Sequence, residues 1–159
     1  MIVKNFIKEC YPSFTKQQIA QAVENMHKKI LRLTLKGIWY DMIAAGTKTE
    51  EYREIKPYWE KRLLDYKALS DYVDKNYESL LVYQFIVHGN IQPHIDGCKM
   101  FPRGYLVVTF SRGYGVNMPH MSFVLQSITM GQGKTEWGAP AETPVFIIKL
   151  GKRLDYVLY

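Results

Sequence analysis

The residues most able to do chemistry lie together in Gly46–Arg53, an eight-residue segment that reads GTKTEEYR. If the chain is extended from Thr49 onward, Thr49, Glu51 and Arg53 project from one face, because strand side chains alternate between two faces. A hydroxyl, a carboxylate and a guanidinium would then converge on one polar ligand, which the guanidinium could hold through two hydrogen bonds. Lys48, at the entrance to this row, supplies a point charge for phosphate or an amine for base chemistry. The alternative is a surface ion pair between Glu51 and Arg53 beside a solvated lysine, and spacing alone favours it.

A second group of candidates lies in two glycine-rich loops at predicted strand ends. Arg112 and Tyr114 belong to the first loop, and Lys134 and Trp137 belong to the second. Loops held by a scaffold can combine charge for phosphate with aromatic rings that stack on bases, which predicts RNA or nucleotide binding. The alternative is ordinary turn chemistry, with Tyr114 and Trp137 packing over the edge of a barrel.

Two further patterns are excluded as sites. The segment Gly131–Thr135 is similar to the end of a phosphate loop, but the first glycine and the following helix are missing, so an ATPase is not expected. His88, His94 and Cys98, with Asp96 between them, match no familiar zinc spacing. We therefore expect neither a metal nor another cofactor.

Composition is consistent with one compact domain of 159 residues, 47% of them hydrophobic. Lysine and arginine exceed aspartate and glutamate by 21 to 15, and this charge of +6 favours a polyanionic partner. No apolar stretch approaches the roughly 20 residues of a membrane span, so no membrane association is expected. The first twelve residues lack the apolar run of a secretory leader, and two cysteines suit a reducing compartment, so we expect a cytoplasmic protein.

Several elements are predicted to position the Gly46–Arg53 segment. Thr15 and Gln18 form a capping-box pair that begins a helix over 15–30. Alternating leucines predict a strand over 31–36, and Gly46 is expected to end the short helix that follows it. An extended segment over 49–55, with Glu50 and Tyr52 on the face opposite to Glu51, leads to a helix that Pro57 opens.

Four more strands are expected behind these helices, over 80–88, 105–111, 120–130 and 144–150. Tyr156, Leu158 and Tyr159 alternate as in a final edge strand. Helices near the front and strands behind predict an α+β fold, in which a curved or barrel-like sheet is flanked by helices.

The pattern G-x-K-x-x-E-x-R, filled by Gly46, Lys48, Glu51 and Arg53, resembles the signature of ASCH domains, which belong to the PUA-like superfamily of small β-barrels. Other segments are similar to ASCH proteins from bacteria and their phages: Trp39–Ile43, Lys56–Leu63, Phe110–Gly115, Glu136–Pro140 and Phe146–Gly151. The resemblance covers about residues 31–151 and implies an ASCH-like domain there, with an insertion at about 67–104. The N-terminal helical extension, over 1–30, and the C-terminal edge segment, over 152–159, lie outside it and are predicted from the residues themselves.

The resemblance also implies a function. ASCH domains are thought to bind RNA or modified nucleotides in a cleft lined by the signature, and some small members hydrolyse 4-acetylcytidine. Their catalytic lysine corresponds to Lys48, but a threonine acts where this chain has Glu51, and the nearest hydroxyl on that strand face is Thr49. We therefore expect slow hydrolysis or none, with Glu51 orienting a ligand.

Three hypotheses remain open at this point. The leading one is an RNA- or nucleotide-binding module that uses Lys48, Glu51 and Arg53 together with the two glycine-rich loops. The second is a hydrolase acting on a modified nucleoside or on RNA, with Lys48, Glu51 and Thr49 as its catalytic residues. The third is a domain that serves only to bind another protein, whose identity the sequence does not give.

Overall fold

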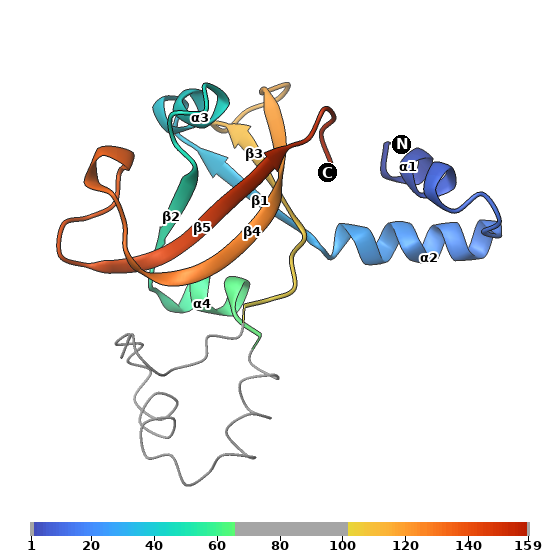
Figure 1. Ribbon diagram of the computed structural model, residues 1–159, viewed down its shortest axis with the longest axis horizontal. Helices are drawn as coiled ribbons and strands as arrows, with labels where there is room; N and C mark the ends of the chain where they lie inside the picture. The colour runs from blue at the N-terminus through green and yellow to red at the C-terminus, as the bar shows by residue number, and fades with distance from the viewer. Residues whose placement is uncertain (1, 66–101, 159) are drawn as a thin grey trace, which may run out of the picture. The chain divides into compact units, whose positions relative to one another are not determined.

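The computed structural model describes residues 2–65 and 102–158, and Figure 1 draws them as a coloured ribbon. Two compact units make up the chain: the first comprises Met1–Thr49, Gly104–Gln126 and Lys149–Tyr159, and the second comprises Glu50–Arg103 and Ser127–Ile148. The predicted strand over 80–88 and most of the predicted insertion lie outside the described residues.

The described part of the chain has a mixed α+β fold with one curled five-stranded sheet and a few helices, as predicted. The strands lie in the order β1-β3-β4-β5-β2. β1 pairs with β3 in parallel, and β3 pairs with β4 antiparallel. The strands are β1 (Ile30–Leu35), β2 (Glu50–Glu54), β3 (Val107–Arg112), β4 (His120–Gln132) and β5 (Pro144–Arg153).

The first unit begins with two helices, α1 (Ile2–Cys10) and α2 (Lys16–His27). The capping box that begins α2 is confirmed, since Thr15 accepts from the Gln18 amide and Gln18 accepts from the Thr15 amide. α2 ends at His27, before the predicted residue 30, because Ile30 already pairs with Val107 in the sheet. The helix α1 lies within the predicted helical extension over 1–30, although it was not predicted as a separate helix.

The apolar core of the first unit joins these helices to the sheet and to the segment after β5. Its buried members are Val3, Ile7, Ile19, Ile30, Val107 and Leu158. Val3 and Ile7 are four residues apart on α1, a spacing that puts both on one helix face and could have revealed this helix. Burying one large apolar side chain stabilises the fold by roughly 1.5–3 kcal/mol relative to leaving that side chain exposed.

The prediction of a final edge strand is wrong for Tyr156 and Leu158, since β5 ends at Arg153 and no strand follows it in the described residues. The buried hydroxyls of Thr109 and Ser122, cross-strand partners in β3 and β4, hold this segment instead. Thr109 donates to the Leu158 carbonyl at 2.5 Å, and the Leu158 amide donates to Ser122 Oγ at 3.0 Å. Tyr159 lies outside the described residues.

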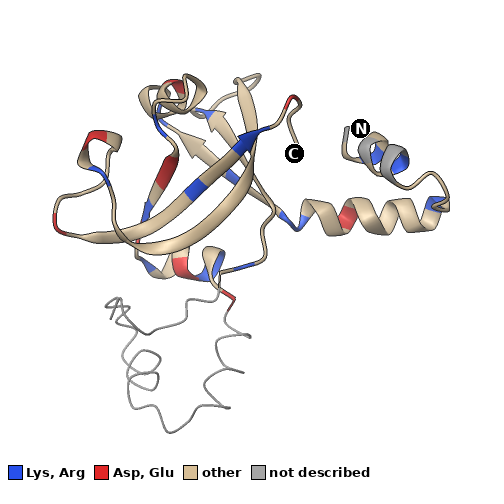
Figure 2. Ribbon diagram, in the orientation of Figure 1, with Lys and Arg blue, Asp and Glu red and all other residues tan. Residues whose placement is uncertain are grey.

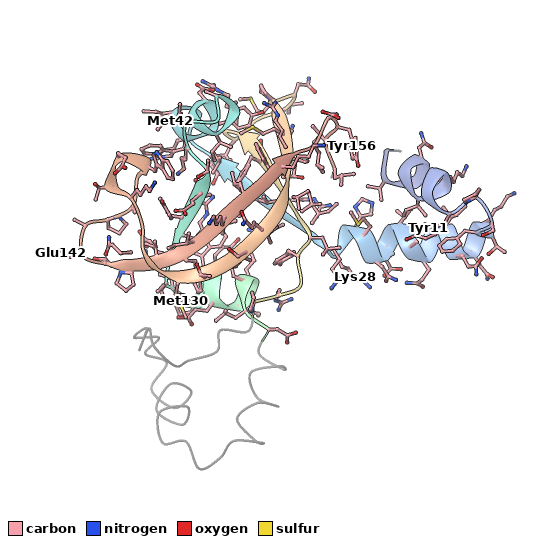
Figure 3. The ribbon with its side chains drawn as sticks, in the orientation of Figure 1. Tyr11, Lys28, Met42, Met130, Glu142 and Tyr156 are labelled. Carbon is pink, nitrogen blue, oxygen red and sulfur yellow. The ribbon has the colours of Figure 1, made fainter. Side chains whose placement is uncertain are left out.

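Helix α3 (Gly37–Ala44) is followed, as predicted, by Gly46 as its C′ residue, which has a φ of 77°. The Gly46 amide donates to the Ile43 carbonyl and the Thr47 amide donates to the Met42 carbonyl, both at 3.0 Å. These two bonds define a Schellman motif, which requires a left-handed residue that glycine adopts most easily. Met42 is labelled in Figure 3.

The second unit contains β2, α4 (Pro57–Leu63) and a short 3-10 turn, η1 (Thr135–Trp137). Pro57 lies in the first turn of α4, as predicted. Tyr52, Ala139 and Val145 form a buried apolar cluster in this unit, against which Trp137 packs. Across the described part of the chain, no helix combines the length and the apolar character that crossing a membrane requires.

We expect Gly46→Ala to lower the free energy of unfolding by about 1–2 kcal/mol, because an alanine must adopt the left-handed conformation there. An added Cβ would meet nothing within 4 Å, so the loss is purely conformational. Gly104→Ala is the control, since it lacks a positive φ and its Cβ would displace only the end of the Lys29 side chain. Urea unfolding followed by circular dichroism measures both variants, and equal midpoints would contradict the prediction.

Candidate functional site

Lys48 lies immediately after the C-terminal turn of α3 and is buried. Its amide donates to the Met42 carbonyl at 3.2 Å, and the Thr47 hydroxyl donates to the same carbonyl at 3.0 Å. The side chain places its ammonium 4.9 Å from the centre of the Trp39 ring, and the residue is only 2% exposed. A cation is favoured both over an indole face and beside the negative end of a helix. The alternative of a solvated lysine is therefore wrong.

Glu51 and Arg53 form an ion pair on one face of β2, with side chains 5% and 14% exposed. Arg53 Nη1 donates to Glu51 Oε1 and also, at 2.7 Å, to the Tyr52 carbonyl. The contact between residues two apart confirms that both side chains share a face. This pair is not a surface pair, so the alternative of an exposed cross-strand contact is also wrong. Figure 2 shows acidic and basic residues side by side along β2.

Helix α4 brings an aromatic and a second guanidinium to Arg53. The Arg53 guanidinium lies 5.0 Å from the centre of the Trp59 ring, and the Arg62 guanidinium lies 5.4 Å from the same centre. Arg62 also donates to the Tyr58 hydroxyl at 3.1 Å, and Tyr58 packs edge-on against Trp59. We call Arg53, Tyr58, Trp59 and Arg62 the Trp59 cluster.

The sequence analysis did not single out Tyr58, Trp59 or Arg62 as site residues. One signal was available, because Tyr58 and Arg62 are four residues apart and so must lie on one face of a helix that Pro57 begins. The sequence alone does not show that this helix contacts Arg53.

The opposite face of β2 carries Glu50 and Tyr52. The Tyr52 hydroxyl donates to Glu50 Oε2 at 2.8 Å and accepts from the Lys134 amide at 3.2 Å. Lys134 in turn places its ammonium 4.0 Å from the centre of the Trp137 ring. The approach of the loop to Tyr52 requires Gly133, because a Cβ there would lie 2.5 Å from the Ala139 side chain.

The predicted site residues therefore belong to different places. Within the second unit, Glu51 and Arg53 lie on the face of β2 that meets Trp59, whereas Lys134 and Trp137 meet the face that carries Tyr52. Thr49 belongs to the first unit, where it is exposed and its carbonyl accepts from the Leu150 amide at 3.0 Å. A cleft lined by the signature stays a prediction.

The other predicted loop belongs to the first unit. Arg112 donates through Nε and Nη2 to both carboxylate oxygens of Asp41, each at 2.9 Å. These hydrogen bonds hold the pKa of Asp41 below its usual value. Tyr114 is 92% exposed, so the alternative that it packs over the barrel edge is wrong. A phosphate at Arg112 would have to compete with Asp41, whereas the Tyr114 ring is open to stacking.

Two sequence patterns were excluded as sites, and the structure describes only the first of them. Gly131–Thr135 leads into η1, a single 3-10 turn, and not into the long helix of a phosphate loop. His88, His94, Asp96 and Cys98 lie outside the described residues. Within residues 2–65 and 102–158, no three histidine, cysteine, aspartate or glutamate side chains gather as metal ligands would.

No family model matches the sequence, and comparison with curated proteins and with solved structures also gives no match. The ASCH resemblance therefore depends on the sequence motifs alone.

Tyr52 gives the site a measurable pH dependence. Burial, reinforced by the Glu50 carboxylate, raises the pKa of Tyr52 to about 12, above its ordinary value of about 10. The unfolded chain therefore loses this proton first as the pH rises, so stability is complete below pH 10 and falls between pH 10 and 12.

We expect Tyr52→Phe to be less stable than the wild type at pH 8, since the Lys134 amide and Glu50 lose a partner. Its further loss between pH 9 and 11 should be smaller, because it has no phenol to ionise. Urea midpoints at the three pH values measure both effects. An identical loss in the two proteins between pH 9 and 11 would show that Tyr52 ionises normally.

Proposed function

We propose that this chain is an ASCH-like module that binds RNA or nucleotides, with the Glu51–Arg53 pair of β2 and the buried Lys48 among the residues that contact the ligand. The observation that carries the proposal is the burial of Lys48 and Glu51, two charged residues three positions apart, which are 2% and 4% exposed. Burying charge costs free energy, and a pair of apolar residues is often at least as stable in such a place. Buried charges of this kind are therefore frequent at ligand sites.

The cations near the tryptophans support the same proposal. The chain has three tryptophans, Trp39, Trp59 and Trp137, and each has a lysine or arginine over its ring. All three indoles are partly exposed. Single-stranded nucleic acids are bound by this combination, because a ring stacks on a base while a neighbouring cation meets the phosphate.

We favour the binding of RNA or nucleotides over the hydrolysis of a modified nucleoside. Glu51 stands where the resemblance places a nucleophilic threonine, and its carboxylate is held by Arg53. A carboxylate fixed in this way suits the orientation of a ligand, since it accepts hydrogen bonds from a base amino group.

The test is the anisotropy of a labelled 12-nucleotide single-stranded RNA, titrated with protein at several salt concentrations. We expect affinity to fall with salt, at a log-log slope of about −0.7 for each neutralised phosphate. Lys48→Met, which keeps the apolar stem and removes the charge, should weaken binding by about tenfold, or roughly 1.4 kcal/mol. Lys134→Ala should reduce the slope by about 0.7.

Lys16→Ala is the matched control, because it removes the same charge from the exposed surface of α2. Lys16→Ala should leave the affinity for RNA at moderate salt unchanged, and Lys48→Met should weaken binding equally with and without it. Thermal unfolding of Lys48→Met separates lost binding from lost folding. Equal affinity in wild type and folded Lys48→Met would overturn the proposal, and an unchanged slope in Lys134→Ala would remove that lysine from the interface.

The hydrolase hypothesis has its own test. We expect 4-acetylcytidine to be hydrolysed slowly or not at all, because Glu51 replaces the nucleophilic threonine. Acetate is measured enzymatically over many equivalents of substrate. Multiple turnovers that are abolished by both Lys48→Ala and Thr49→Ala would identify Thr49 as the nucleophile. The hydrolase hypothesis would then replace the binding proposal.

A further inference from the structure

The loop over 113–119 joins β3 to β4 beside α3 (Figure 1), and its tip carries two large apolar side chains. Tyr114 is 92% exposed and Val116 is 89% exposed, and one residue separates them in the chain. Single apolar residues on a surface are ordinary, but two that are almost fully exposed and so close together form a patch. A partner that covered this patch would recover the free energy that its exposure to water costs.

Hydrogen bonds hold the base of this loop. The Arg112 amide donates to the Pro119 carbonyl at 3.0 Å, which closes the loop on itself. The Gly113 amide donates to the Leu35 carbonyl of β1 at 2.7 Å, and the Ser111 hydroxyl donates to the Gly113 carbonyl at 3.1 Å. The loop is thus tied to the neighbouring strand, so binding at its tip requires little further ordering of the backbone.

Three residues with a positive φ shape the tip. Gly113 and Gly115 have φ values of 74° and 153°, and Asn117 has a φ of 59°. Glycine and asparagine adopt such conformations more easily than other residues, so the sequence suits this course of the chain. The Met118 side chain lies beside Gly115, where an added Cβ would be 3.4 Å from its Sδ. The loop therefore packs one of its apolar side chains against its own backbone and leaves the other two in solvent.

The charge around the tip suits a polyanion. The sequence from Val107 to Val124 contains no aspartate or glutamate. Asp41, which approaches the base of the loop from α3, is paired with Arg112 through two hydrogen bonds. Lys36, immediately after β1, is exposed. A phosphate backbone that passed this loop would meet little repulsion, and an exposed aromatic ring is the side chain on which bases stack. These features favour a nucleic acid as the partner of the tip.

We propose that Tyr114 stacks on an unpaired base of the bound RNA and that Val116 makes an apolar contact with the same nucleotide. This inference rests on the proposed function, and it adds a contact in the first unit that selects single-stranded over double-stranded RNA. A base inside a duplex already has neighbours on both faces, whereas an unpaired base offers a face to the phenol ring. The contact tolerates any sequence, because every base has such a face.

The test is the anisotropy of a labelled 12-nucleotide RNA, alone and annealed to its complement, titrated with the full chain. We expect Tyr114→Ala to weaken binding of the single strand by about tenfold and to leave duplex binding within twofold. Its log-log slope with salt should equal that of the wild type, since no charge is lost. Tyr114→Trp should bind the single strand at least as tightly as the wild type, because its ring also stacks. Val116→Thr, which has a similar shape but adds a hydroxyl, should weaken binding by about threefold.

Tyr11→Ala is the matched control, because Tyr11 is also an exposed tyrosine of the first unit, and its ring already stacks on Phe14 with centres 4.7 Å apart. It should leave both RNA affinities unchanged. Linear polyphosphate of about twelve phosphates supplies the charge without bases, and Tyr114→Ala should bind it as tightly as the wild type does. An equal loss of affinity for polyphosphate and for single-stranded RNA would overturn the stacking contact.

The outcomes separate this inference from the proposed function. If Tyr114→Ala binds single-stranded RNA as tightly as the wild type, the stacking contact is refuted, the binding module remains and the tip becomes a candidate contact for another protein instead. If Tyr114→Ala loses single-stranded and duplex RNA equally, the selection of an unpaired base is refuted. If the wild type binds no RNA, the proposed function fails and the contact fails with it. A circular dichroism spectrum identical to that of the wild type is required of each variant.

Discussion

The alternation of side chains along β2 is the constraint on which the rest of the candidate site depends. Because neighbours in a strand face opposite ways, the segment Glu50–Arg53 must serve two environments at once. Glu51 and Arg53 are directed to α4 and its indole, while Glu50 and Tyr52 are directed to the loop that precedes η1. A shift of one residue in the pairing of this strand would exchange the two sets and leave both environments without their polar partners.

The two faces are unlike in chemistry. On one side a phenol bridges a carboxylate and a backbone amide, which makes a well-satisfied junction between the strand and the loop after β4. On the other side a carboxylate and two guanidiniums share the neighbourhood of one indole. The first arrangement holds structure, since its polar atoms are satisfied by one another. The second retains charge near a partly exposed ring, and the proposed binding function depends on that charge.

Local signals in the sequence were sufficient for most of the elements that carry these faces. The capping pair at Thr15, the left-handed Gly46 and the proline that begins α4 each act through backbone geometry within a few residues, so they can be recognised without the fold. The alternation in β2 followed from the same kind of reasoning, and its consequence for Glu51 and Arg53 was correct.

Contacts between distant residues were beyond the reach of such signals. Asp41 and Arg112 are 71 residues apart, and Tyr52 and Lys134 are 82 residues apart. No local sequence signal distinguishes an arginine that pairs with a carboxylate from one that can bind phosphate. The burial of Lys48 was also missed, because no local signal shows that its ammonium meets the ring of Trp39, nine residues earlier at the other side of the α3 C-terminal turn.

The segment that follows β5 shows what two hydroxyl groups can do in place of a strand. Leu158 lies outside regular secondary structure, and backbone of that kind ordinarily exchanges its amide hydrogens with solvent early. Here the amide is bound to Ser122, whose hydroxyl also contacts Thr109 at 2.7 Å beneath the apolar core. We therefore expect this amide to exchange with solvent as slowly as the amides of β3 and β4, although the backbone around it has the form of a loop.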